Sequence, residues 1–386
     1  MRILLNASTL RSGGGVQVAS GFISNALRSE THDWLFVVSS AVLDNLPSEA
    51  VDDERIRVVD MHPRRPLAAR KTRVQLDNLA HVFTPDLTFT ILGPPYWSPR
   101  STHVCGFAVP WVVFGGGAAW ATVPVAMRPL VYANNLYRRS KLSRSWYYWM
   151  ESEAGTTRLA SKLRIDPGRT YVIPNCPHPV FLEQRWVGSP DGNSLNCRGT
   201  RAVFTVLCLS AYYPHKNLEL VPEVAAQLVK RGRDGFVFQL TLPPEGRGWL
   251  GIARKAERLG VTDKVVNLGP QRIQDCPGLY AEADAAFLPT LLEVFSATYV
   301  ESIIMRKPLV TTAIPPAREV CGPAALFFAP FDAAGASGHL VRLMTDQAFY
   351  QARVAACEAA APSVISAEQK YRMTLAMLED VHARSR

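Results

Sequence analysis

The sequence lacks the cysteine patterns that mark disulfide frameworks and zinc sites. Its 7 cysteines are scattered along 386 residues, and none falls in a C-x-x-C pair or another metal-ligand spacing. The apolar run in MRILLNAS is too short for the core of a signal peptide, and no small-residue cleavage site follows it. We therefore expect a reducing, cytoplasmic location, with this run as a buried first strand.

Heptads, low-complexity tracts and short-period repeats are also missing, as are the signatures of RRM, KH and helix-turn-helix domains. A nucleic acid partner is therefore not expected. Residues 104–127 carry no charged side chain, yet Pro110, Pro124 and three consecutive glycines at 115–117 would break a membrane-spanning helix. This stretch is predicted to form a strand, a loop and a short segment within a domain.

The composition is that of a globular protein with room for two cores, because 48% of the residues are hydrophobic and 19% are charged. The formal net charge of +9 is uneven. Residues 1–185 hold 21 Lys and Arg against 14 Asp and Glu, and the remainder holds 21 against 19. Such a basic half suits nucleic acid, an anionic membrane or a phosphorylated substrate, and composition alone does not choose among them.

Short β-rich apolar runs alternate with helical periods, which is the pattern of parallel βαβ units. In the first half we predict strands at residues 3–6, 35–39, 56–59 and 87–92, and a helix from Gly15 to about Arg28. A second series of strands and helices begins at AVFTVLCLS and continues to PLVTT. The fold class is therefore α/β, with two doubly wound Rossmann-like domains.

The boundary between the domains is predicted near the turn-rich segment GSPDGNSLNCRG, which follows the proline-rich YVIPNCPHPVF. We assign residues 1–185 to the first domain and residues 186–365 to the second. Helical spacing of apolar residues in 366–386 predicts a C-terminal helix that packs back on the protein.

The strongest functional signal is LLEVFSATYVESIIMRKPLVTT, which follows the predicted strand DAAFLPT. It places Glu293 in a loop and Glu301 eight positions later, two turns inside a helix. A rise of 1.5 Å per residue separates these positions by roughly 12 Å, the reach of a sugar-diphosphate-ribose unit. One glutamate is then expected at the transferred sugar and the other at the ribose hydroxyls. An isolated pair of glutamates would instead indicate a solvated helix, and the surrounding segments favour the functional interpretation.

The start of that helix is predicted to bind a diphosphate without a metal ion. First-turn N–H groups lack partners within a helix, and they carry a partial positive charge. The residues in question are Phe295, Ser296, Ala297 and Thr298. Lys216 in LSAYYPHKNLELV follows the first strand of the second series, where open α/β sheets bind ligands, and is a candidate cation for a phosphate.

These segments resemble family 4 of the retaining glycosyltransferases, the glycosyl transferases group 1. The resemblance rests on Pro214, His215, Lys216 and Asn217, on Glu293 and Glu301, and on roughly sixty residues from LYAEADAAF to APFD. It implies a GT-B fold whose two domains face a cleft. It also implies that Lys216 binds the donor phosphate, Glu293 lies against the donor sugar and Glu301 binds the ribose.

The chain departs from the family pattern at two positions. Many members have an arginine where this chain has Ala211, and a glycine where it has Val294. Fewer cations are therefore expected to meet the phosphate charge.

In the first domain, SGGGVQVASGF follows the first strand, so Gly14 and Gly15 are candidates for close backbone approach to a phosphate or acceptor. The segment lacks G-x-G-x-x-G spacing, and a plain strand-to-helix turn is the alternative. The resemblance favours a functional glycine loop. It also makes His103 a candidate for contact with the donor sugar, predicted at the carboxyl side of the sheet, with His62 and His81 as alternatives.

The resemblance implies a hexosyl- or deoxyhexosyltransferase that uses a nucleotide-diphosphate sugar, with a glycan or lipid-linked acceptor in bacterial surface-polysaccharide synthesis. No D-x-D triplet or His/Cys ligand set is present, so neither a metal nor another cofactor is expected. The alternative is a GT-B relative that is not a transferase, such as a sugar-nucleotide epimerase or a phosphorylase.

The segment YRRSKLSRSWYYW raises the hypothesis of peripheral contact with an anionic membrane at the inner face of the cytoplasmic membrane. Basic side chains would meet lipid headgroups, and the aromatic rings that follow would lie at the interface. The alternative is a solvated basic helix followed by aromatic residues that pack in the core. The residues concerned are Arg138, Arg139, Lys141, Arg144, Trp146, Tyr147, Tyr148 and Trp149.

Overall fold

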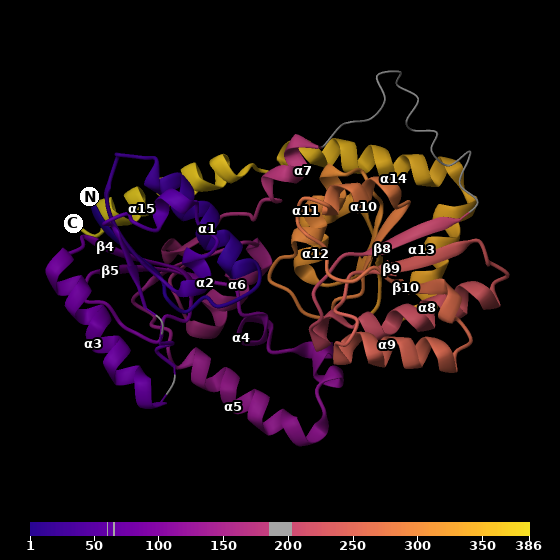
Figure 1. Cartoon of the computed structure of the whole chain (residues 1–386), viewed down its shortest axis with the longest axis horizontal. Coiled ribbons are helices and arrows are strands. Elements are labelled where there is room, and N and C mark those ends of the chain that lie inside the picture. Colours follow the sequence, from indigo (N-terminus) through magenta and orange to yellow (C-terminus); the bar gives the residue numbers. More distant parts are fainter. Residues whose placement is uncertain (60, 65, 185–202) are drawn as a thin grey trace. The chain divides into compact units, whose positions relative to one another are not determined.

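The computed structural model describes residues 1–59, 61–64, 66–184 and 203–386, which form two compact units (Figure 1). Unit 1 comprises Met1–Gly115, Met127–Pro174 and Ala367–Arg386, and unit 2 comprises Gly116–Ala126 and Asn175–Ser366. The predicted linker GSPDGNSLNCRG and the predicted boundary between residues 185 and 186 lie outside the described residues.

Unit 1 contains a seven-stranded parallel sheet of order β3-β2-β1-β4-β5-β6-β7. Its central strands are apolar along their length because helices cover both faces of the sheet. Ile3 of β1 pairs with Trp34 of β2 and with Leu87 of β4, and all three are buried. The strands are β1 (Arg2–Ala7), β2 (Asp33–Val38), β3 (Ile56–Val58), β4 (Leu87–Gly93), β5 (Thr102–Phe107), β6 (Tyr147–Met150) and β7 (Thr170–Val172).

The helices of unit 1 form two cores, one on each side of this sheet. Helices α1 and α15 contribute to the larger core, and α3 packs on the opposite face against Leu4 and Val37. A buried ion pair between Lys370 of α15 and Glu151, 3.5 Å long, ties the C-terminal helix to this unit. The helices are α1 (Gly14–Leu27), α2 (Ser40–Leu43), α3 (Pro66–Phe83), α4 (Pro110–Phe114), α5 (Arg128–Arg139), α6 (Glu153–Leu163) and α15 (Ala367–Arg384), with 3-10 turns η1 (Ser48–Ala50) and η4 (Pro167–Arg169). The 3-10 turn η3 (Val125–Met127) spans the passage of the chain from unit 2 to unit 1.

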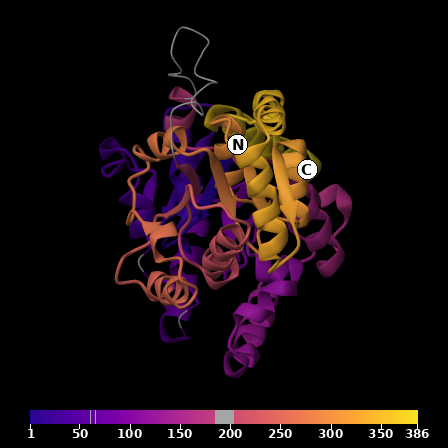
Figure 2. The same ribbon diagram turned by 90° about the vertical axis from the view of Figure 1, so that its right-hand side faces the viewer.

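Unit 2 contains a six-stranded parallel sheet of order β10-β9-β8-β11-β12-β13. Helices α8, α9 and α13 cover one face of this sheet, and α10, α11 and α12 cover the other. Helix α13 packs on β12 and β13. Figure 2 shows yellow-orange helices of this part of the chain beside the strands. The strands are β8 (Phe204–Cys208), β9 (Phe236–Leu240), β10 (Val265–Asn267), β11 (Ala285–Leu288), β12 (Leu309–Thr312) and β13 (Ala325–Phe328).

In unit 2, helices alternate with strands along the sequence, as parallel βαβ units require. The helices are α7 (Pro179–Glu183), α8 (Val221–Lys230), α9 (Arg247–Arg258), α10 (Cys276–Glu282), α11 (Ala297–Ile304), α12 (Pro315–Cys321), α13 (Ala333–Thr345) and α14 (Gln347–Ala360). The 3-10 turns are η2 (Gly117–Thr122), η6 (Pro214–Lys216), η7 (Leu218–Leu220), η8 (Thr262–Lys264), η9 (Gly322–Ala324) and η10 (Ala361–Ser363). The predicted fold class of two doubly wound α/β domains is confirmed.

The uncharged stretch 104–127 forms most of β5, then α4, η2 and η3, in agreement with the predicted strand and short segments. No described helix is long and apolar enough to cross a membrane. The predicted placement of aromatic rings at a membrane interface was wrong for residues 146–149. Trp146 is buried just before β6, and Tyr147, Tyr148 and Trp149 are buried within it, because a strand covered on both faces reads as a continuous apolar run.

Candidate functional site

The strand order of unit 2 reverses between β8 and β11, so the connections that leave these two strands diverge to opposite sides of the sheet. Open α/β sheets bind ligands at the carboxyl ends of strands at such a switch point. Lys216 ends η6, in the connection after β8, and Glu293 lies in the connection after β11. The fold therefore places both predicted residues at the expected position.

An ion pair joins these two residues. The Nζ atom of Lys216 lies 2.5 Å from Oε1 of Glu293, and the two side chains are 13% and 10% exposed. The hydroxyl of Thr290 donates to the same carboxylate oxygen at 3.1 Å. The two connections are held together by their backbones, because the amide of Leu291 donates to the carbonyl of His215 at 2.8 Å.

Glu301 is the fifth residue of α11, and its carboxylate is buried. The Tyr280 hydroxyl donates to it at 3.1 Å. Burial raises the pKa of Glu301 to about 7, while the Tyr280 hydrogen bond and the positive charge of Lys216 lower it in part. Lys216 thus acts electrostatically on both glutamates. The predicted separation of roughly 12 Å rested on a helix position two turns in, and this was wrong because α11 begins at Ala297, one turn before Glu301.

The start of α11 lies at the carboxyl end of β8. Ser296 is its N-cap residue with no side-chain cap, Ala297 is exposed, and Phe295 and Thr298 are buried. The Thr298 hydroxyl donates to the carbonyl of Leu209, directly after β8, at 3.3 Å. First-turn N–H groups of α11 therefore point to the same edge of the sheet as Lys216, which suits a diphosphate.

The glycines of unit 1 lie at the corresponding edge of their own sheet, where the strand order reverses between β1 and β4. Gly14 begins α1, after Gly13 with a φ of 74°, a conformation that favours glycine. A Cβ atom on Gly14 would meet nothing, whereas one on Gly15 would lie 3.2 Å from the Leu10 side chain. Gly15 therefore has a packing role, and ligand contact by either glycine stays a prediction.

His103 does not lie where the sequence placed it. It is the second residue of β5, at the amino end of the strand, because residues 94–101 run back along the sheet without a helix. Its Nε2 lies 2.8 Å from the Thr90 hydroxyl, and its ring packs on Trp146. Burial lowers its pKa to about 3, so the imidazole is neutral and inaccessible. The predicted position at the carboxyl side of the sheet was wrong, and the alternatives His62 and His81 stay untested.

Sequence reasoning missed Thr290, Tyr280 and the segment Gly116–Ala126. Thr290 lies just after the end of β11 and three residues before Glu293. Its position at the end of a strand could have identified it as a candidate site residue. Tyr280 was not predicted because its position in the sequence fits a buried aromatic residue on the apolar side of a helix. The segment Gly116–Ala126 belongs to unit 2, where η2 packs against η6, the turn that carries Lys216. No local signal indicates that long-range contact.

The raised pKa of Glu301 leads to a stability prediction. A glutamate whose folded-state pKa lies above its usual value stabilises the fold at low pH, and this contribution is lost as the pH rises from about 4.5 to about 7. We expect Glu301→Gln to raise the free energy of unfolding at pH 8 relative to the wild type, by up to roughly 3 kcal/mol, and to have little effect near pH 4.

Denaturant unfolding of both proteins at the two pH values measures this difference. Glu257→Gln, at an exposed position of α9, is the matched control. The prediction fails if the stability difference for Glu301→Gln is the same at both pH values.

Among the described residues, no group of three or more His, Cys, Asp or Glu side chains is arranged to hold a metal ion. Residues 203–346 match the family model described as Glycosyl transferases group 1. Unit 2 therefore contains a domain of this type. No curated protein sequence matches the chain.

Solved structures resemble the whole chain. A glycosyltransferase from Rickettsia africae is 16% identical and has a TM-score of 0.70, with 98% of each chain covered. WaaG, a glycosyltransferase involved in lipopolysaccharide biosynthesis, is 15% identical with a TM-score of 0.70 over 97% of this chain and 99% of its own. HepE from Anabaena, in complex with UDP and glucose, is 16% identical with a TM-score of 0.70 over 98% of this chain and 100% of its own. The protein therefore has the GT-B fold.

Proposed function

We propose that this protein is a retaining glycosyltransferase that moves a sugar from a nucleotide-diphosphate donor bound by unit 2 to a glycan or lipid-linked acceptor bound by unit 1. The observation that carries the proposal is the convergence of Lys216, Glu293 and Glu301 at the switch point of unit 2. The group 1 family match over residues 203–346 covers all three residues. HepE, which shares the fold, is known in complex with UDP-glucose.

In the proposed reaction, the bond between the sugar C1 and the diphosphate oxygen breaks, and a bond from C1 to the acceptor oxygen forms on the same face. The acceptor proton passes to the departing diphosphate. Lys216 and the N-terminus of α11 stabilise the charge that develops on that diphosphate, which is the role of preorganised donors in catalysis. These protein groups supply positive charge without a metal ion, so we expect activity to persist in the presence of a chelator.

The two glutamates have different proposed tasks. Glu293 already lies against Lys216, so its carboxylate would contact the donor sugar beside the reacting carbon. Glu301 lies one turn inside α11, and its ionised carboxylate would accept hydrogen bonds from the ribose hydroxyls. Because the pKa of Glu301 is about 7, we expect donor affinity to fall as the pH drops below that value.

The experiment that tests the function has two stages. Thermal unfolding with GDP, UDP, dTDP and ADP identifies the nucleotide, because a bound ligand stabilises the folded state by mass action. The matching labelled sugar nucleotides are then supplied with candidate glycan and lipid-linked acceptors, and the product is analysed by NMR. A glycoside with the donor's anomeric configuration supports the proposal, whereas an inverted glycoside refutes retention.

The same product analysis without acceptor separates the transferase from its alternatives. A sugar nucleotide with changed stereochemistry would indicate an epimerase. In a separate incubation of the protein with a glycan and inorganic phosphate, release of a sugar 1-phosphate would indicate a phosphorylase. Either result would refute the proposed transfer.

A lipid-linked acceptor would require the enzyme to work at the cytoplasmic face of a membrane in surface-polysaccharide synthesis, a setting related to the lipopolysaccharide biosynthesis in which WaaG is involved. Helix α5 is a suitable surface because none of its residues is buried. Three large apolar side chains of α5, Leu130, Tyr132 and Leu136, are 62%, 59% and 47% exposed. Arg138 and Arg139 lie in the last turn of this helix. An amphipathic basic helix of this kind binds anionic interfaces.

We expect the protein to float with anionic vesicles at low salt and to dissociate at high salt. Each basic residue near such a surface contributes about 1 kcal/mol, so the attachment should be weak. Flotation with anionic and neutral liposomes measures it, with Tyr132→Ser/Leu136→Ser as the test variant and Val266→Ser, an exposed apolar position of unit 2, as the control. Absence of binding to anionic vesicles at low salt would refute the membrane proposal.

A further inference from the structure

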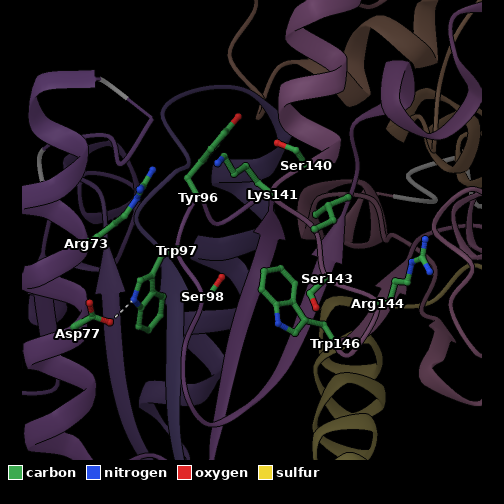
Figure 3. A pocket seen from close by; sticks show the side chains of 11 residues that line it. Arg73, Asp77, Tyr96, Trp97, Ser98, Ser140, Lys141, Ser143, Arg144 and Trp146 are labelled. Carbon is green, nitrogen blue, oxygen red and sulfur yellow. Dashed lines mark hydrogen bonds between the residues drawn. The ribbon is translucent and has the colours of Figure 1, made fainter.

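Unit 1 contains two adjoining hollows beside α3 that share Arg73 as a lining residue. The first lies between α3 and residues 140–146, which follow α5, and the second lies between α3 and α5 itself. Their volumes are about 740 Å³ and 880 Å³, within the usual range for ligand sites. We call them together the α3–α5 groove. Figure 3 shows Arg73 and Asp77 along one side of the first hollow, Lys141 and Trp146 along the other, and Trp97 and Ser98 between them.

The groove exists because of an unusual connection in the sheet. Parallel neighbours are normally joined through a crossover helix, which would cover the face of the sheet. The connection from β4 to β5 is residues 94–101, which contain no helix. Trp97, in this connection, packs into the core between the sheet and α3. It covers the apolar face of the sheet there, and the groove lies on the outer side of this connection.

Five cations line the groove, namely Arg64, Arg70, Arg73, Lys141 and Arg144. Among the described residues, none of these five forms an ion pair with a carboxylate. Asp77 is the one carboxylate among the described lining residues, and it accepts a hydrogen bond from Trp97 Nε1 at 2.8 Å. The groove is therefore strongly electropositive.

Two further observations indicate that this charge serves an anionic ligand. The Nε atom of Arg73, at the junction of the two hollows, is buried without a hydrogen-bond partner, and a buried unpaired donor is costly. Residues 87–150 contain no Asp or Glu but six Lys and Arg. The elements that form one side of the groove thus contribute no compensating negative charge.

Aromatic rings lie among these cations. Tyr96 and Tyr137 are stacked with ring centroids 5.9 Å apart, and the Nζ atom of Lys141 lies 4.9 Å from the centre of the Tyr137 ring. Tyr96 has a φ of 54°, which is rare for a bulky residue. Tyr96 is buried and Tyr137 is 36% exposed, so the Tyr137 ring is the aromatic surface that lies among the cations. An exposed aromatic ring beside cations suits a ligand that combines a sugar ring with a phosphate.

We propose that the α3–α5 groove binds the phosphate-bearing end of the acceptor, so the acceptor is a phosphorylated saccharide and not a neutral glycan. The proposal rests on the transfer function above and names the acceptor class for it. Guanidinium groups bind phosphate oxygens with paired donors, and three of the five cations are arginines on or next to the start of α3. The same chemistry occurs in a soluble sugar phosphate and in a lipid-linked sugar diphosphate.

Calorimetric titration tests the proposal with glucose, glucose 1-phosphate and farnesyl diphosphate as probes. The full chain is first saturated with the nucleoside diphosphate that stabilises it best, so that phosphate binding at Lys216 is blocked. The test variant is Arg70→Gln/Arg73→Gln, and Arg70→Gln/Lys141→Gln is a second variant that leaves the partly buried Arg73 in place. Lys71→Gln, an exposed neighbour on α3 that does not line the groove, is the matched control.

We expect a phosphorylated probe to bind and glucose not to bind. Both test variants should weaken phosphate binding by about 10-fold to 100-fold, and Lys71→Gln should not. Preference for glucose 1-phosphate would indicate a soluble phosphorylated acceptor, and preference for farnesyl diphosphate a lipid-linked one. Absence of phosphate binding, or equal binding by the test variants and the control, would overturn the proposal. Failure to bind any nucleoside diphosphate would instead refute the proposed function. Titration with the three probes in the absence of a nucleotide would then show whether the groove binds phosphate.

Discussion

Replacement of Glu293 by glutamine should lower turnover by about 10²-fold to 10³-fold while donor binding is largely retained, because the carboxylate acts on charge that develops in the transition state. Glutamine keeps the size of the side chain and can still accept the Thr290 hydrogen bond through its amide oxygen. It removes the negative charge that faces Lys216. The expected loss therefore falls on kcat and leaves the donor KM close to its wild-type value.

Steady-state kinetics with the donor identified by thermal unfolding measure this split. Glu257→Gln on α9 controls for the loss of one carboxylate elsewhere in unit 2. Thr290→Val should give a smaller loss, because it removes the hydrogen bond but leaves the carboxylate charge. Wild-type kinetics for Glu293→Gln would end the argument that Glu293 acts beside the reacting sugar.

Replacement of Lys216 by alanine should weaken binding of a nucleoside diphosphate by about 10-fold to 100-fold, because a charge-assisted contact to phosphate is lost. Binding of the bare nucleoside should change little. The variant should also be less stable, because removal of one member of a buried ion pair leaves the Glu293 carboxylate without its counter-ion.

A double variant separates the two effects. In Lys216→Ala/Glu293→Gln the unpaired charge is gone, so stability should recover toward the wild-type value while diphosphate binding stays weak. Lys230→Ala, at the exposed end of α8, is the control for a lost surface cation. Equal weakening of nucleoside and nucleoside diphosphate by Lys216→Ala would remove this lysine from the phosphate site.

Much of the candidate site follows from sequence because its residues lie next to strand ends. Lys216 and Glu293 are 77 positions apart in the sequence. Each follows a predicted strand, and the carboxyl ends of parallel strands meet at one edge of a sheet. The ion pair between them is the structural consequence.

The failures have different physical causes. His103 was assigned to the wrong end of the sheet because residues 94–101 return along the sheet without a helix. The aromatic run 146–149 resembled an interface motif because β6 has apolar neighbours on both faces. The contact of η2 with η6 depends on tertiary packing over about one hundred residues, and no local pattern encodes it.

The exchange of segments between the units limits how the protein can be dissected genetically. The chain passes from one unit to the other four times, after residues 115, 126, 174 and 366. A fragment that stops at residue 185 would lose α15, whose Leu378 and Val381 are fully buried in the core of unit 1. A fragment that starts at residue 186 would lose Ala119, which is fully buried in unit 2. Isolated halves would therefore expose core surface and aggregate, and either unit would stay soluble alone only with its distant segment grafted back through a new linker.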